Sequence, residues 1–233
     1  MSDVSFLPYA QWINQETYPH PISKIVCVGR NYAAHAQELN NPIPSEPLLF
    51  CKTANAVTAL PGEIRWPQGR GSCHFEGEIA LLIGQKLQGN TSLEQANQAI
   101  IGLGLALDLT LRQRQDQLKA AGHPWEVAKT WDASCPLSPF IPVTEDLRWD
   151  KLTLEVRINE QVRQQGSSEH MLTPILSLVA FIAQHFTLYP GDVVLTGTPA
   201  GVGELHPGDQ VELRLNSALQ VSAQVPPLSE ARL

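Results

Sequence analysis

Hydrophobic and polar residues alternate along much of this chain, and the pattern predicts a strand-rich α+β fold. Residues 152–159 place Leu152, Leu154, Val156 and Ile158 on one face, which is the two-residue period of a half-buried strand. The pair Asn159-Glu160 then predicts a turn into a partner strand that includes Val162. Short apolar runs between turn residues predict further strands at 24–28, 48–51, 73–83, 100–109, 192–195, 210–215 and 219–225.

Helices are expected only where a capping or breaking signal accompanies the pattern. Thr91 and Glu94 fit a capping box. Thr173 followed by Pro174 fits an N-cap with proline at the first helical position. The predicted helices cover residues 31–39, 94–101, 110–121 and 174–185.

Composition limits the class of protein. The chain has 233 residues, of which 43% are hydrophobic and 17% charged, so it is a compact globular protein. A net charge of −7 argues against a nucleic-acid partner. No apolar run reaches the ~20 residues of a membrane helix, and the start of the chain lacks the pattern of a secretion signal.

The four cysteines have no CxxC spacing, so reduced thiols and a cytoplasmic location are expected. The chain has no clear internal linker. We therefore predict one domain over residues 24–233, preceded by an N-terminal extension over residues 1–23.

Three carboxylates in otherwise apolar stretches are the strongest candidates for chemistry. Glu76 and Glu78 lie two residues apart, so on one strand their side chains project together, about 7 Å apart at their roots. Asp108 is the only charged residue between positions 95 and 109. Should their strands be neighbours, three carboxylates would converge, which suits Mg²⁺ or Mn²⁺. His74 shares the predicted face, so a His/Glu/Glu site for Zn²⁺ or Fe²⁺ is an alternative.

Three other features could serve a reaction. His35 and Glu38 lie three apart on a predicted helix, where the carboxylate could orient the imidazole as a general base; a solvated surface pair is the simpler interpretation. Lys129 could neutralise an anionic substrate, or could lay its stem along neighbouring tryptophans. Residues 191–203 form a strand followed by a glycine-rich loop, which could bind a carboxylate or be only a sharp turn.

Together these segments resemble the fumarylacetoacetate hydrolase family, in particular its short, single-domain, acylpyruvase-like members. The resemblance extends in order and spacing from about residue 24 to 225. The matching segments are Gly29-Arg30-Asn31-Tyr32 with His35 close behind, Phe75-Glu76-Gly77-Glu78, Asp108, Lys129, and Thr196 to Gly203. The resemblance implies a mixed β-roll of the type found in the family's C-terminal domain, a homodimer, and a single catalytic domain over residues 24–233.

The resemblance also implies roles for individual residues. Glu76, Glu78 and Asp108 match the three ligands of a Mg²⁺ or Mn²⁺ ion. His35 and Glu38 match a water-activating dyad carried on a segment that orders over the substrate. The remaining matches are Lys129 as a substrate-neutralising lysine, Arg112 and Gln115 as substrate contacts, and Gly197 and Thr198 in the loop that contacts the substrate carboxylate.

The function expected from this resemblance is hydrolysis of 2,4-diketo acids, the acylpyruvates, to pyruvate and a carboxylic acid. The same metal site could instead decarboxylate oxaloacetate, interconvert keto and enol forms, or isomerise a 2-hydroxydienoate. A protein that binds an oxo acid and a metal without turnover is the non-enzymatic alternative. The His35–Glu38 pair favours water activation, and therefore the hydrolase.

Overall fold

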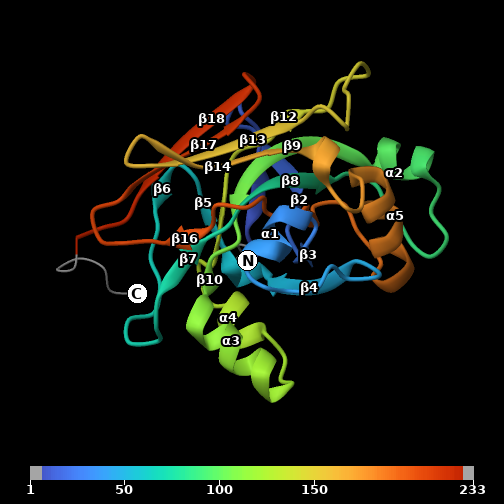
Figure 1. Ribbon diagram of the computed structural model, residues 1–233. Coiled ribbons are helices and arrows are strands. Elements are labelled where there is room, and N and C mark those ends of the chain that lie inside the picture. Colours follow the sequence, from blue (N-terminus) through green and yellow to red (C-terminus); the bar gives the residue numbers. More distant parts are fainter. Residues whose placement is uncertain (1–6, 228–233) are drawn as a thin grey trace, which may run out of the picture.

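The computed structural model describes residues 7–227 of the chain and consists mainly of curled β-sheets with few helices (Figure 1). The strands are β1 (Tyr9–Gln11), β2 (Thr17–Pro21), β3 (Lys24–Gly29), β4 (Leu48–Thr53), β5 (Val57–Ala59), β6 (Gly62–Glu63), β7 (Cys73–Phe75), β8 (Gly77–Ile83), β9 (Ile100–Leu107), β10 (Thr110–Leu111), β11 (Cys135–Leu137), β12 (Ile141–Pro142), β13 (Thr153–Ile158), β14 (Gln161–Ser167), β15 (Val193–Leu195), β16 (Gly203–Glu204), β17 (Gln210–Leu215) and β18 (Leu219–Gln224). The helices are α1 (Ala33–Glu38), α2 (Leu93–Ala99), α3 (Arg112–Ala121), α4 (Glu126–Lys129) and α5 (Ile175–His185), with 3₁₀ turns at Ala54–Ala56 and Ser168–His170.

An eight-stranded mixed sheet forms the centre of the molecule. Its order is β4-β3-β15-β8-β9-β11-β5, and β12 also pairs with β9. A five-stranded sheet, β14-β13-β17-β18-β6, lies above it in Figure 1, while α2 and α5 lie together at one side and α3 with α4 below. A small sheet, β10-β7-β16, lies close to α3 and α4. The predicted strand-rich α+β fold is therefore confirmed.

Strand β8 contributes to two hydrophobic cores because both of its faces are buried. Ile79, Leu81 and Ile83 pack in the larger core, together with residues of the five-stranded sheet and α5. Ala80 and Leu82 pack in the smaller core on the opposite face. A strand buried on both faces needs no polar positions, which explains its continuous apolar run.

The predicted strand over residues 73–83 is interrupted at Glu76. β7 belongs to the small sheet, and β8 to the central one. Gly77 permits this change of sheet, because a Cβ atom there would lie 2.3 Å from Cγ2 of Val156. Its amide donates a hydrogen bond of 2.9 Å to Oε1 of Gln164, so the break leaves that buried group satisfied.

Two predicted helix starts were misplaced. The capping box uses Ser92 and Gln95 in place of Thr91 and Glu94, since the Gln95 side chain returns a hydrogen bond to the Ser92 amide. Helix α5 has Pro174 as its N-cap, without a side-chain capping bond, so the predicted Thr173 cap was wrong.

Two other helix limits also differ from the prediction. The predicted helix over 110–121 begins only at Arg112, because the two residues before it pair with β7 as β10. Helix α1 begins at Ala33, two residues after the predicted position. Tyr32 precedes it in an extended conformation as the N-cap.

The predicted hairpin of the second half is confirmed. β13 and β14 pair antiparallel, and the connecting residues Asn159 and Glu160 both have positive φ angles, 50° and 68°. Positive φ angles at both turn residues are typical of a two-residue hairpin turn whose twist matches that of the flanking strands. The alternating side chains of β13 are buried against the central sheet, as the two-residue period predicts.

Residues 7–22 form a small hairpin on the central sheet. β1 and β2 pair with each other, and Ala10 and Ile22 are buried in the smaller core. The amide of Phe140 donates a hydrogen bond of 2.7 Å to the carbonyl of Gln11. The division into an extension (1–23) and a catalytic domain (24–233) stays a prediction, and residues 1–6 and 228–233 lie outside the described part.

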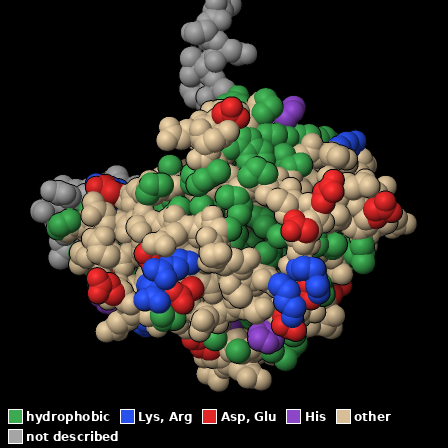
Figure 2. Space-filling view, turned by 90° about the horizontal axis from the view of Figure 1, so that it is seen from above, with side chains coloured by type: hydrophobic (Ala, Val, Ile, Leu, Met, Phe, Trp, Pro, Cys, Tyr) green, Lys and Arg blue, Asp and Glu red, His purple; other side chains and the backbone are tan. Residues whose placement is uncertain are grey.

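The surface seen from above carries a broad area of hydrophobic side chains, with charged groups around it (Figure 2). Among residues 7–227, no helix is long and apolar enough to cross a membrane. The homodimer and the cytoplasmic location expected from the sequence stay predictions.

The thiols provide a test of this core. Burial raises the pKa of the Cys27 thiol well above its usual value and the pKa values of Cys73 and Cys135 to about 12. Cys51 is only half-buried, and burial raises its pKa less. Alkylation of the native protein near pH 8, followed by mass spectrometry, is expected to modify Cys51 alone, because the thiolate is the nucleophile. Rapid modification of a second thiol before unfolding would contradict the described core, and Cys51→Ser is the control.

Candidate active site

Three buried carboxylates meet where β8 and β9 run side by side. β8 carries Glu78, Glu76 immediately precedes it, and Asp108 immediately follows β9. The two strands are antiparallel, and the Asp108 amide donates a hydrogen bond of 2.8 Å to the Glu76 carbonyl. One carboxylate oxygen from each residue lies within 4.8 Å of the others. The strand pairing therefore produces the convergence expected from the sequence.

Two cations neutralise one side of this cluster. Lys129 Nζ donates hydrogen bonds to Asp108 Oδ2 at 2.5 Å, to Glu76 Oε2 at 2.8 Å and to Thr110 Oγ1 at 2.7 Å. Arg112 donates a hydrogen bond to the other oxygen of Glu76. Burial alone would raise the pKa of Glu76, but Lys129 and Arg112 outweigh it and hold that pKa well below its usual value.

Lys129 keeps its proton in this environment. Burial lowers the pKa of its ammonium group, but Asp108 and Glu76 outweigh that effect and raise the pKa above its usual value. Lys129 is therefore a hydrogen-bond donor and a fixed positive charge rather than a base.

Glu78, on the other side of the cluster, forms no ion pair with any described residue. Glu78 Oε2 accepts a hydrogen bond of 2.6 Å from the Gly197 amide, and burial together with Asp108 and Glu76 raises the pKa of Glu78 well above its usual value. Asp108 Oδ1 accepts no hydrogen bond among the described residues, although Lys52 Nζ lies 2.9 Å away. A buried carboxylate oxygen without a hydrogen bond, beside a carboxyl group of raised pKa, fits a site for an additional cation.

His74 does not take part in this cluster. The only group of described residues with converging ligand atoms consists of the three carboxylates. Glu76 and Glu78 project together as expected, but His74 lies on β7 in another sheet, so the expectation that it shares their face was wrong. The structure therefore does not support the alternative zinc or iron site.

Helix α1 carries the His35–Glu38 pair against the glycine-rich loop, residues 196–203. His35 Nδ1 lies 3.1 Å from Glu38 Oε2, and the other oxygen of Glu38 accepts a hydrogen bond of 2.9 Å from the Gly201 amide. Asn31 joins the two segments further, because its Nδ2 donates to the Thr196 carbonyl at 2.9 Å. His35 is only 5% exposed, whereas the Glu38 side chain is 31% exposed, so the imidazole is shielded from solvent although its carboxylate partner is not.

The loop is fixed by bonds to buried groups. Gly197 has a φ of 94°, and a Cβ atom there would lie 2.7 Å from Cβ of Asn31, so glycine is required. The Thr198 hydroxyl donates to the Gly77 carbonyl at 2.8 Å and accepts from Gln164 Nε2 at 2.7 Å. The expected substrate contacts of Gly197 and Thr198 stay predictions, because the Gly197 amide and the Thr198 hydroxyl both bind protein groups.

One cavity brings together most of the predicted site residues. Its lining includes His35, Glu76, Glu78, Asp108, Arg112, Gln115, Lys129 and Thr198. Gln115 accepts a hydrogen bond of 2.7 Å from Arg112 Nη1, which fixes the guanidinium. Glu38 and Gly197 do not line the cavity and instead contact His35 and Glu78, which do.

The sequence analysis missed Lys52. It lies on β4, is fully buried, and donates hydrogen bonds to the carbonyls of Lys129 and of Ser134, the latter at 3.1 Å. A single charge inside an apolar segment, the signal that identified Asp108, was also present at Lys52. Lys52 follows the apolar run 48–51 directly, a position easily interpreted as the solvated end of a strand.

Residues 24–226 match the C-terminal domain of fumarylacetoacetate hydrolase. The chain belongs to the fumarylacetoacetate hydrolase family. One relative is the oxaloacetate tautomerase YcgM of Escherichia coli, which is 48% identical over 193 residues, or 82% of this chain and 88% of that protein. The mitochondrial oxaloacetate decarboxylase of Dictyostelium discoideum is 40% identical over 190 residues, or 81% of this chain and 87% of that protein.

Solved structures agree with this membership. The fumarylpyruvate hydrolase of Pseudomonas aeruginosa, crystallised with Mn²⁺ and pyruvate, superposes with a TM-score of 0.88 at 30% identity. The match covers 96% of this chain and 97% of that one. These comparisons confirm the family and the β-roll of its C-terminal domain, which the sequence motifs predicted. They also support the prediction that the protein is an enzyme of this family.

Lys52 gives the testable prediction for this site. Lys52→Met removes a buried ammonium group and leaves buried carbonyls and Asp108 with fewer partners, so the free energy of unfolding is expected to fall by about 3–5 kcal/mol. Urea denaturation measures this change. Lys86→Met, at an exposed position, is the matched control and should cost less than about 0.5 kcal/mol. Equal stability of the two variants would contradict the role given to Lys52.

Proposed function

We propose that this protein is a metal-dependent oxaloacetate tautomerase, which interconverts the enol and keto forms of oxaloacetate. The observation that carries the proposal is the position of His35, oriented by Glu38, in the same cavity as three buried carboxylates. The name of the Escherichia coli relative at 48% identity supports this choice of reaction.

Glu76, Glu78 and Asp108 fit a hard divalent cation, Mg²⁺ or Mn²⁺. All three are carboxylates, and within residues 7–227 Asp108 Oδ1 has no hydrogen bond and Glu78 has no basic side chain as a hydrogen-bond donor. Oxygen ligands of this kind suit Mg²⁺ and Mn²⁺. When bound, such an ion supplies a positive charge that stabilises negative charge developing on the 2-oxo oxygen of a substrate.

Arg112 and Lys129 would hold the acidic end of the substrate. Both side chains are buried, line the cavity and carry fixed positive charges. Gln115 fixes the Arg112 guanidinium by a hydrogen bond of 2.7 Å. A protonated Lys129 cannot abstract a proton, which leaves the base to another residue.

His35 is the proposed acid and base. Glu38 holds Nδ1, so the other ring nitrogen, Nε2, would remove a proton from C3 of the keto form and return it in the opposite direction. The imidazolium would then give that proton to the 2-oxo oxygen as the enol forms, so one proton is relocated and the reaction needs no water or co-substrate. The bond from Gly201 to Glu38 maintains this orientation.

Hydrolysis of acylpyruvates, the first expectation from the sequence, remains a second candidate. The fumarylpyruvate hydrolase with 30% identity and the same fold favours it. In that reaction His35 would remove a proton from water instead of from carbon. Oxaloacetate decarboxylation, dienoate isomerisation and binding without turnover stay predictions on the same residues.

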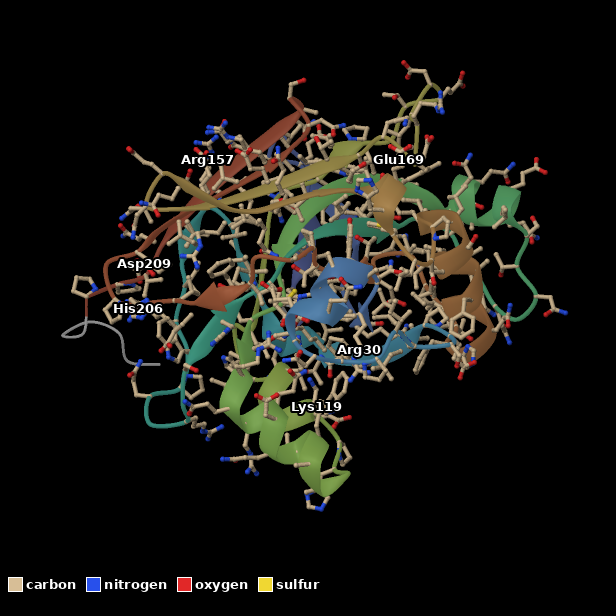
Figure 3. All side chains as sticks on the ribbon, viewed as in Figure 1. Arg30, Lys119, Arg157, Glu169, His206 and Asp209 are labelled. Atoms are coloured by element: carbon tan, nitrogen blue, oxygen red, sulfur yellow. The ribbon has the colours of Figure 1, made fainter. Side chains whose placement is uncertain are left out.

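The proposal is tested by following oxaloacetate through the ultraviolet absorbance of its enol, with Mg²⁺ present. His35→Gln is expected to lower the rate of tautomerisation by about 10²-fold or more, because a general base contributes about that much. His206→Gln is a matched control, since His206 also lies three residues from a carboxylate, Asp209, but is exposed (Figure 3).

Several outcomes discriminate between the candidates. Release of pyruvate and acetate from acetylpyruvate, at a rate above tautomerisation, would favour the hydrolase. Unchanged tautomerisation in His35→Gln would contradict the assigned base. Binding of oxalate without turnover of either substrate would favour the silent binding protein.

Glu78 gives a prediction of pH dependence for metal binding. Since burial, Asp108 and Glu76 raise its pKa in the metal-free protein, Glu78 must lose a proton to become a ligand. Affinity for Mn²⁺ is therefore expected to rise about tenfold per pH unit below that pKa and to level above it. Titration calorimetry should detect the released proton.

Glu78→Gln should bind Mn²⁺ weakly and without this pH dependence. Glu169→Gln, at an exposed position, is the control (Figure 3). If the affinity of the unaltered protein for Mn²⁺ did not change with pH, the assignment of Glu78 as a metal ligand would be wrong.

A further inference from the structure

Two cations that the proposed mechanism does not use line the cavity of the candidate site. Arg30 follows β3 in the turn before α1, and Lys119 lies in the last turn of α3. Figure 3 labels both residues, which lie near each other on these separate elements. Two positive charges from distant parts of the chain therefore border the same space.

Neither cation is neutralised by a close carboxylate. Arg30 Nη2 donates a hydrogen bond of 3.0 Å to the neutral Asn41, and no ion pair of Arg30 occurs within residues 7–227. Lys119 Nζ lies 4.0 Å from Asp116, whose side chain is 63% exposed. Burial lowers the pKa of Arg30. Burial also lowers the pKa of Lys119, and the positive charges of Arg112 and Arg30 lower it further. An anion between them would relieve this unfavourable electrostatic energy.

The inner end of the cavity has the opposite arrangement. There Lys52, Lys129 and Arg112 each lie against Glu76 or Asp108. Of the cations that line the cavity, Arg30 and Lys119 therefore have less compensation by carboxylates than Arg112 and Lys129.

The positions of both cations are fixed. The Arg30 backbone has a φ of 60°, a left-handed conformation that non-glycine residues rarely adopt, and the bond to Asn41 holds its guanidinium. Lys119 Nζ lies 5.4 Å from the ring centre of Trp125, which in turn meets Phe50 edge to face at 5.9 Å. Trp125 and Phe50 also line the cavity, so an aromatic wall holds the Lys119 side chain beside it.

We propose that Arg30 and Lys119 bind the distal carboxylate of a 2-oxo dicarboxylic acid. The 2-oxo acid end would lie at the three carboxylates and their cations, and the second carboxylate between Arg30 and Lys119. The site would then prefer such dianions to acylpyruvates with an uncharged acyl end. This inference rests on the proposed function, because it assumes that an oxo acid binds at the inner end.

The test compares two ligands that differ only at the distal end. 3,3-Difluorooxaloacetate carries the second carboxylate, and 3,3-difluoro-2-oxobutanoate has a methyl group there. Neither has a hydrogen on C3, so neither can enolise, and calorimetry with the Mn²⁺-loaded protein measures binding alone. We expect the unaltered protein to bind the dicarboxylate at least about tenfold more tightly, since charged hydrogen bonds contribute that much.

Lys119→Met and Arg30→Gln each remove one positive charge. Each is expected to raise the Kd of the dicarboxylate about tenfold and to change the Kd of the monocarboxylate less than about twofold. Arg114→Met is the matched control, because Arg114 lies on the same helix, bonds to Gln117 and does not line this cavity. Its two Kd values should stay unchanged.

Equal losses for both ligands, or no loss in either variant, would overturn the inference. Equal binding of both ligands by the unaltered protein would overturn it while leaving the proposed function intact. Failure to bind either ligand would overturn the proposed function as well. Thermal unfolding measurements check that each variant is folded. If Arg30→Gln is unfolded, Lys119→Met decides the question, because methionine preserves the aliphatic part of the side chain beside Trp125.

Discussion

The antiparallel pairing of β8 with β9 is the constraint on which the site depends. It buries Glu76, Glu78 and Asp108 side by side, an arrangement that would be prohibitively unfavourable without compensating positive charge. Lys52 from β4 and Lys129 from α4 provide much of that charge and attach the outer elements to the central pair. The electrostatic requirement of the site therefore also determines how β4, α4 and the start of α3 pack.

The separation of roles within the cavity follows from these local environments. Lys129 is surrounded by carboxylates that raise its pKa and keep it protonated, whereas burial and the neighbouring carboxylates raise the pKa of Glu78 well above its usual value. His35 lies on a different segment, with a carboxylate holding one of its nitrogens. The two glutamates, Glu76 and Glu78, thus have pKa values shifted in opposite directions because their neighbours differ.

Much of this arrangement could be predicted from the sequence because it depends on local signals. The alternating residues of β13, the glycine-rich loop and the isolated charge at Asp108 each have a meaning within a few residues. The break at Glu76 could not be predicted, since it depends on the contact of Gly77 with Val156, nearly eighty positions away. Lys52 and the pair Arg30 and Lys119 were missed for the same reason: only the tertiary fold shows what surrounds them.

Helix α1 has only six residues, too few for a stable helix in isolation. Its attachment through Asn31 and through the bond from Gly201 to Glu38 therefore supplies the order that the segment lacks by itself. If His35 is the base, as proposed, catalysis requires this segment to be folded and attached, because these bonds orient the imidazole. The fraction of molecules with an oriented base can then change while the stability of the two hydrophobic cores stays constant.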